Sequence, residues 1–221
     1  GSMVATFLVI GIMCWLVMFS PVEAASADQI EASPLFDDLG SLHHPITTTS
    51  ELAQQYFDQG LRLVYAFNHE EAIRSFEAAA RQDPQAAMPY WGIALALGPN
   101  INSEMGKKDE RRAIEMVQKA RRLATNAIPR EQAYIEALAA RYLGRKGVKR
   151  KDLDEAYAKA MRLVMQQFPD DLDAATLFAE ALMDLRPWDL WKQDGRPQPG
   201  TEEIVTTLAA SGGAGGVCSA G

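Results

Sequence analysis

Small residues recur at helical spacing around one large aromatic side chain within residues 53–86, and this pattern constrains the fold more than any other. Ala72, Phe76 and Ala79 follow one another at intervals of four and three residues, which places them on one face of a helix. Gly60 lies in the first half of the stretch, where a missing side chain lets a second helix approach closely. The stretch therefore predicts two antiparallel helices in close contact.

The same arrangement returns three more times along the chain. The first helices of the successive pairs are expected at residues 53–67, 86–97, 130–143 and 171–185, and the last partner helix, near 201–210, is expected to be short. A single helix pair buries its second face only against a neighbour, so the pairs must stack. The sequence predicts an all-α chain of stacked helix pairs.

This register resembles the tetratricopeptide repeat family over residues 39–205. The blocks "FNHEEAIRSF", "YWGIALALGPNIN" and "RPWDLW" are similar to those of exported bacterial members of the family. The repeat positions that carry the resemblance are Tyr56, Gly60, Ala72, Phe76, Ala79, Pro84, Tyr90 and Ala94. The resemblance implies an α-solenoid of about three and a half repeats, with first helices lining a concave groove for a protein or peptide. It implies no reaction.

The ends of the chain differ from this repeat region. Residues 1–27 are expected to comprise a cloning scar and a signal peptide, because "VATFLVIGIMCWLVMF" precedes small residues that offer cleavage after Ala24 or Ala27. The alternative is a retained N-terminal membrane anchor. Residues 28–49 form a polar lead, 50–210 the repeat domain and 211–221 a flexible Gly/Ala-rich tail. The protein is expected to be exported, either periplasmic or secreted.

Charge and motif content exclude several function classes. The net charge of −7 argues against nucleic-acid binding, which needs a basic face. Two cysteines cannot build a disulfide framework. The sequence contains no nucleophile elbow, phosphate loop, dinucleotide fingerprint or zinc-protease motif. We therefore expect a protein without catalytic activity and assign no cofactor.

Loop lengths indicate where a binding site lies. Connections from first to second helices lengthen along the chain, whereas the return connections stay short, so insertions gather at one edge. The polar residues at this edge are the candidate small-ligand site, namely Asn68, His69, Asn100, Asn102 and Glu104. A structural interpretation competes with this one, because Asn68 followed by Glu71 is typical of a helix capping box, and "GPNIN" is typical of a turn.

Two loops at the same edge carry candidate partner contacts. Arg145 and Lys146 belong to a basic loop that either docks an anionic partner or is simply solvated. Trp188 and Trp191 are expected either to plug the end of the repeat stack or to anchor a partner, and a plug is the favoured expectation.

The histidines His43, His44 and His69 are weak candidates for a metal site. His69 begins a second helix, while His43 and His44 precede the first, so the polar lead must fold back along that helix to bring them together. We assign no metal from the sequence.

The leading hypothesis is a non-catalytic scaffold that binds proteins or peptides outside the cytoplasm. One alternative is a small-molecule or metal-binding protein, or an unrecognised enzyme, that uses Asn68, His69, Asn100 and Asn102. The other is a structural protein that self-assembles through its stacked ends. A membrane contact is expected only through the N-terminal apolar segment, if that segment is not cleaved.

Overall fold

A computed structural model describes residues 33–143 and 147–214, and within these ranges the chain is all α. The expected all-α class is therefore confirmed. The apolar run and both expected cleavage sites lie outside the described residues, as does most of the Gly/Ala-rich tail. No helix in the described ranges is both long and apolar enough to cross a membrane.

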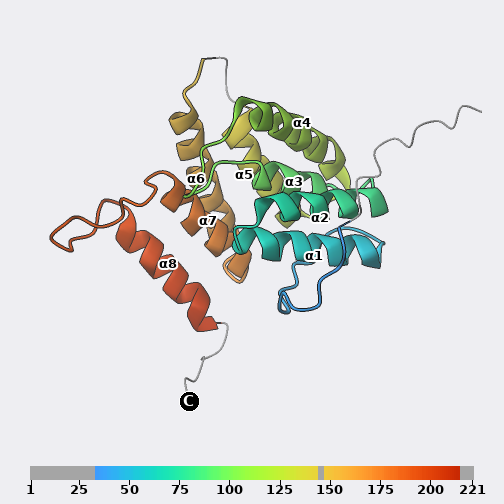
Figure 1. Ribbon diagram of the computed structural model, residues 1–221, viewed down its shortest axis with the longest axis horizontal. Coiled ribbons are helices and arrows are strands. Elements are labelled where there is room, and N and C mark those ends of the chain that lie inside the picture. Colours follow the sequence, from blue (N-terminus) through green and yellow to red (C-terminus); the bar gives the residue numbers. More distant parts are fainter. Residues whose placement is uncertain (1–32, 144–146, 215–221) are drawn as a thin grey trace, which may run out of the picture. The chain divides into compact units, whose positions relative to one another are not determined.

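The described residues form eight α-helices, and each packs against the next one in the chain (Figure 1). In addition, α1 contacts α3, and α3 contacts α5. The long connections follow α3, α5 and α7, as the loop pattern predicts. The bounds are α1 Glu51–Tyr65, α2 His69–Gln82, α3 Met88–Ala96, α4 Lys107–Leu123, α5 Pro129–Tyr142, α6 Arg150–Gln167, α7 Leu172–Asp184 and α8 Thr201–Ala214, with a short 3₁₀ turn at Ala124–Asn126.

Phe76 of α2 explains why the first helix pairs can pack so closely. A Cβ atom added at Gly60 of α1 or at Gly92 of α3 would lie 2.6 Å from the Phe76 ring, closer than carbon atoms approach without a clash. The ring is fully buried between the two glycines. Glycine at both positions therefore lets α1 and α3 contact the same aromatic side chain.

Six of the eight repeat positions expected from the sequence are buried, whereas Pro84 is exposed. Tyr56 is only partly buried, and the fully buried aromatic residue of α1 is its neighbour Phe57. The Phe57 ring lies 5.4 Å from the Phe76 ring. Tyr56 packs against the core at its edge, whereas Phe57 and Leu61, one turn apart on α1, face the core fully.

The capping box predicted at the start of α2 is confirmed only for Asn68. Asn68 caps the helix, since its side-chain oxygen accepts a hydrogen bond from the Glu71 N–H at 3.4 Å. Glu71 does not close the expected capping box. Its carboxylate instead accepts a hydrogen bond from the Ser33 hydroxyl at 2.5 Å and forms an ion pair with Arg74, because the polar lead brings Ser33 beside it.

Two expectations near the C-terminus were wrong. Helix α8 extends through Gly212 and Gly213 to Ala214, although a flexible tail was expected from residue 211. Extending an existing helix costs far less than nucleating one, so glycines at its end are tolerated. Trp188 and Trp191 do not form a plug, because their side chains are 79% and 55% exposed.

Candidate functional site

The described part of the polar lead, residues 33–49, runs back along α1 and is held there by side chains of that helix (Figure 1). Arg62 donates to the Leu42 carbonyl at 3.0 Å, and Asp58 accepts from the His44 N–H at 3.0 Å. Gln54 donates to the His44 carbonyl and accepts from the Ile46 N–H, both at 2.9 Å. Because Gln54, Asp58 and Arg62 are four residues apart, they form one row on the helix.

Further side chains, from α1 and from the start of α5, also form hydrogen bonds with the main chain of the lead. Gln59 donates to the Pro34 carbonyl at 2.8 Å and accepts from the Phe36 N–H at 2.7 Å. At the start of α5, Glu131 accepts from the Thr47 N–H at 2.5 Å, and Arg130 donates to the Pro45 carbonyl at 3.0 Å. We call this set the lead-binding face; its members are Gln54, Asp58, Gln59, Arg62, Arg130 and Glu131.

A buried polar cluster joins the lead to α7. His44 Nδ1 lies 2.6 Å from Asp173 Oδ2, and the Tyr65 hydroxyl donates to Asp173 Oδ1 at 2.8 Å. Burial alone would raise the pKa of Asp173, but the hydrogen bonds from His44 and Tyr65 outweigh it and lower the pKa. Asp171 and Tyr134 belong to the same "His44 cluster", which we define as His44, Tyr65, Tyr134, Asp171 and Asp173.

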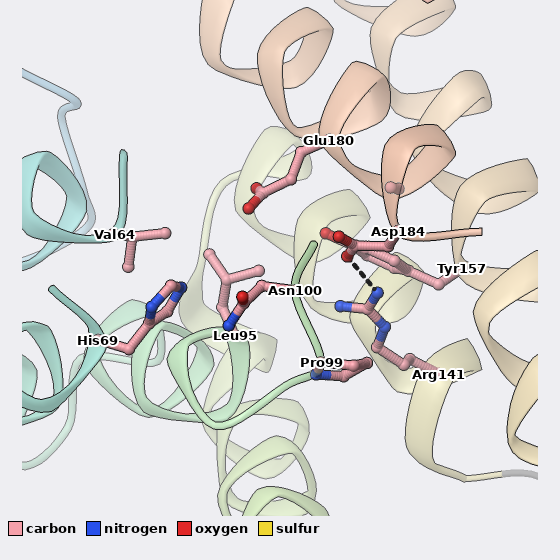
Figure 2. A pocket seen from close by; sticks show the side chains of 10 residues that line it. Val64, His69, Leu95, Pro99, Asn100, Arg141, Tyr157, Glu180 and Asp184 are labelled. Atoms are coloured by element: carbon pink, nitrogen blue, oxygen red, sulfur yellow. Dashed lines mark hydrogen bonds and ion pairs between the residues drawn. The ribbon is translucent and has the colours of Figure 1, made fainter. Parts of the chain in front are cut away.

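A second polar site lies where the C-terminal ends of α1, α3, α5 and α7 meet the start of α2 (Figure 2). Its volume of about 10 Å³ leaves room for a group the size of one water molecule. We call it the polar pocket. The residues that line it are Val64, His69, Leu95, Pro99, Asn100, Arg141, Tyr157, Glu180, Ala181 and Asp184.

Arg141 organises one side of the polar pocket. Its guanidinium donates to Asp184 at 2.9 Å and to Asp154 at 3.0 Å, and it lies 4.4 Å from the centre of the Tyr157 ring. The Arg141 side chain is only 2% exposed. A buried guanidinium is tolerated because two carboxylates and an aromatic face replace its water.

Glu180 and Asp184 bring two carboxyl groups to the same pocket from one turn of α7. Burial, followed by the nearby charge of Asp184, raises the pKa of Glu180 to about 7. Burial raises the pKa of Asp184 to about 6, although Arg141 opposes the shift. Figure 2 shows His69 on the side of the pocket opposite Arg141, and burial lowers the pKa of His69. The pocket therefore holds two carboxyl groups whose pKa values are raised toward neutral pH.

The polar pocket adjoins a larger outer cleft of about 520 Å³, which shares Pro99, Asn100 and Asp184 with it. The cleft presents both signs of charge, with Glu104 and Glu110 near Arg150 and Lys151. Its remaining lining comes from residues 103, 105, 154, 185 and 187. This volume suits a peptide side chain or a small organic molecule.

Only some of the candidate residues predicted from the sequence line the polar pocket or the outer cleft. His69 and Asn100 line the polar pocket, and Asn100 and Glu104 line the outer cleft. Asn68 is a helix cap, and the Asn102 N–H donates to Asn100 Oδ1 at 2.9 Å within the turn. Trp188 and Trp191 are exposed but line neither site. Arg145 and Lys146 lie outside the described residues.

The lead folds back along α1, yet the histidines do not share a site. His43 pairs with Asp58 at 2.7 Å, His44 pairs with Asp173, and His69 lines the polar pocket.

Sequence reasoning missed Arg141, Glu180 and Asp184. The signal was present, because Glu180 and Asp184 stand four residues apart in the otherwise apolar stretch "LFAEALMDL". Like charges at that spacing repel one another on a helix, so the pair needs a compensating partner such as Arg141.

Family models, curated proteins and solved structures were each compared with this chain, and none of them matched it.

Proposed function

We propose that this protein is a non-catalytic scaffold of the tetratricopeptide type, an α-solenoid of stacked helix pairs that binds extended peptide segments of other proteins. The observation that carries the proposal is that side chains of α1 form hydrogen bonds with the main chain of the polar lead. Gln54, Asp58 and Arg62 bind main-chain atoms of residues 42–46, so this mode of binding requires an extended backbone rather than particular side chains. The fold is thus suited to holding a peptide between its helices.

The outer cleft is the place we assign to a partner segment. The lead occupies the lead-binding face, whereas the cleft is open and has a volume of about 520 Å³. Glu104 and Lys151 are exposed at its walls and offer an acceptor and a donor to a peptide backbone. The exposed Trp188 follows directly after Pro187 of the cleft and provides an aromatic anchor nearby.

Selection from a displayed random-peptide library, with the full chain as bait, tests this function. We expect peptides whose binding protects residues 99–105 and 150–154 from hydrogen exchange. The double substitution Glu104→Ala and Lys151→Ala should weaken binding about tenfold or more, whereas Lys159→Ala, an exposed change on α6 outside the cleft, should not. Failure to enrich any peptide, or protection of another surface only, would contradict the proposal.

We also propose that the chain is exported, on the strength of the apolar run and the small residues 24–27. N-terminal sequencing of protein recovered from the periplasm and the medium should find a start after Ala24 or Ala27. Intact protein in the membrane fraction would support the anchored alternative, and intact protein in the cytoplasm would contradict both.

Small-ligand binding is a second candidate function, favoured by the polar pocket. It brings His69 and Asn100 together with Glu180, whose carboxyl group has no hydrogen-bond donor among the described residues. The small volume and the excess of carboxyl groups fit the ammonium group of an amine. A panel of primary amines should then raise the melting temperature, and Glu180→Gln should remove that effect. If no amine shifts the transition, this candidate fails.

Self-assembly through stacked ends is the third hypothesis. Light scattering at high protein concentration tests it, since a mass equal to one chain would count against it.

A further inference from the structure

We propose that His44, Asp171 and Asp173 bind one divalent transition-metal ion of the zinc type, and that the ion fastens the polar lead to α7. One ligand atom from each of the three side chains lies within 4.8 Å of the other two. A single imidazole with two carboxylates is a donor set that suits zinc and its neighbours better than magnesium or calcium, which prefer oxygen ligands alone.

Burial distinguishes this group from an ordinary surface cluster of acids. The His44 side chain is 4% exposed, that of Asp173 is 17% exposed and that of Asp171 is 6% exposed. Buried carboxylates lose their water, so they need cations or hydrogen-bond donors in its place. The folded chain has already removed the solvent that would compete with a metal ion for these ligands.

Unsatisfied polar atoms supply the second observation. Among the described residues, eight buried side-chain polar atoms lack a hydrogen-bond partner, and five of them belong to or border the His44 cluster. Such atoms are rare in folded proteins, and several at one place indicate a bound ion or water. Three of the five have neither a hydrogen-bond nor an ion-pair partner within the described part of the chain, namely His44 Nε2, Glu131 Oε2 and the Tyr134 hydroxyl. The other two, Arg130 Nε and Asp171 Oδ2, face one another as an ion pair at 3.7 Å.

Tyr134 lies beside the proposed ligands. Its side chain is fully buried, and its ring meets the His44 ring edge-on at 5.6 Å. From there its hydroxyl can donate a hydrogen bond to a ligating carboxylate or to a metal-bound water.

Charge balance favours a bound cation at this cluster. Asp171, Asp173 and the buried Glu131 carry three negative charges when ionised, and Arg130 lies 3.7 Å from Asp171. A divalent cation together with Arg130 balances all three charges, whereas Arg130 alone balances only one of them.

Metal titration of the full chain, tag-free and stripped of metal by dialysis against chelator, tests the site directly. We expect Zn²⁺ to bind at one equivalent by calorimetry, and Co²⁺ to give the visible absorption of a low-symmetry site. Zn²⁺ should also slow hydrogen exchange at residues 42–47. Absence of stoichiometric binding by the wild-type chain would overturn the proposal, whatever the variants do.

Matched substitutions locate the ion. His44→Gln and Asp171→Asn should each weaken Zn²⁺ binding more than about tenfold, while His43→Gln and His69→Gln should leave it unchanged. Far-UV circular dichroism checks that each variant is folded. If His44→Gln binds like the wild type, or if His69→Gln abolishes binding, the assignment is wrong. If a variant does not fold, the protection of residues 42–47 by Zn²⁺ in the wild type still decides the case.

Discussion

At the scale of single residues, Glu180 is a carboxyl group that the polar pocket shields from water. Its pKa, raised from 4.5 to about 7, means that the folded chain holds the proton more tightly than the unfolded chain does. The free energy of unfolding should therefore fall as the pH rises from about 4.5 to about 7, and stay low above that range.

Glu180→Gln should remove this penalty, because the amide is neutral at every pH. We expect the variant to be more stable than the wild type at pH 8 by about 1–3 kcal/mol. It should also lose the part of the pH dependence that comes from Glu180, while Asp184, whose pKa is raised to about 6, keeps its own part. Urea unfolding at several pH values measures both effects. The exposed Glu115→Gln serves as the control, and identical pH slopes for the wild type and Glu180→Gln would contradict the prediction.

A second prediction at the scale of single residues concerns Gly92. Gly92→Ala places a Cβ atom 2.6 Å from the Phe76 ring, so it should lower the free energy of unfolding by about 1–3 kcal/mol despite the better helix propensity of alanine. Adding Phe76→Leu, which shortens the side chain, should make the double variant more stable than the sum of the two single changes predicts. Strict additivity in this double-mutant cycle would rule out the contact.

At the scale of elements, the polar lead depends on a few side chains of α1. Asp58→Ala leaves the His44 N–H and the Gln54 amide without their shared acceptor, at a cost of about 1–3 kcal/mol. Hydrogen exchange at residues 42–47 should become faster in this variant. Asp38→Ala, in the exposed part of the lead, should leave exchange there unchanged, and equal effects of the two substitutions would show that Asp58 does not hold the lead.

The helices were predictable and their polar partners were not, for a physical reason. Helical periodicity is local, so "FNHEEAIRSFEAAARQ" indicates both α2 and its Asn68 cap. The pairing of His44 with Asp173 joins residues 129 positions apart, and no spacing in a single sequence encodes that distance. The capping box failed in the same way, because Ser33, far away in the sequence, contacts Glu71.

Two of the candidate residues lie together in the structure. Loop length placed His69 and Asn100 at one edge, because insertions accumulate where they do not disturb packing, and both residues line the polar pocket. The charged groups of the pocket were missed because Arg141, Glu180 and Asp184 lie inside helices, where charged residues usually face water.

At the scale of the whole molecule, stability should be distributed unevenly along the chain. Among the described helices α8 packs its backbone against α7 and is joined to α6 by one exposed ion pair, between Glu203 and Arg162. Ile204 is the large apolar residue of α8 that is buried. Chains built from neighbour contacts open from their ends. The last helix should therefore be the first to unfold.

Ile204→Ala should release α8 without lowering the main unfolding transition by a comparable amount. Leu138→Ala, in the fully buried centre of α5, should instead lower the stability of the whole fold by about 2–5 kcal/mol. Hydrogen exchange resolved by segment, together with thermal unfolding, distinguishes the two. If Ile204→Ala lowers the global transition as much as Leu138→Ala does, the chain unfolds as one unit.

The contact of Phe76 with Gly60 and Gly92 also limits how this sequence can evolve. A mutation that adds a side chain at either glycine while the aromatic ring is present is selected against, and a smaller residue at position 76 leaves a void that only larger neighbours fill. We therefore expect residues 60, 76 and 92 to covary. Related sequences that differ widely elsewhere should keep all three residues or change them together.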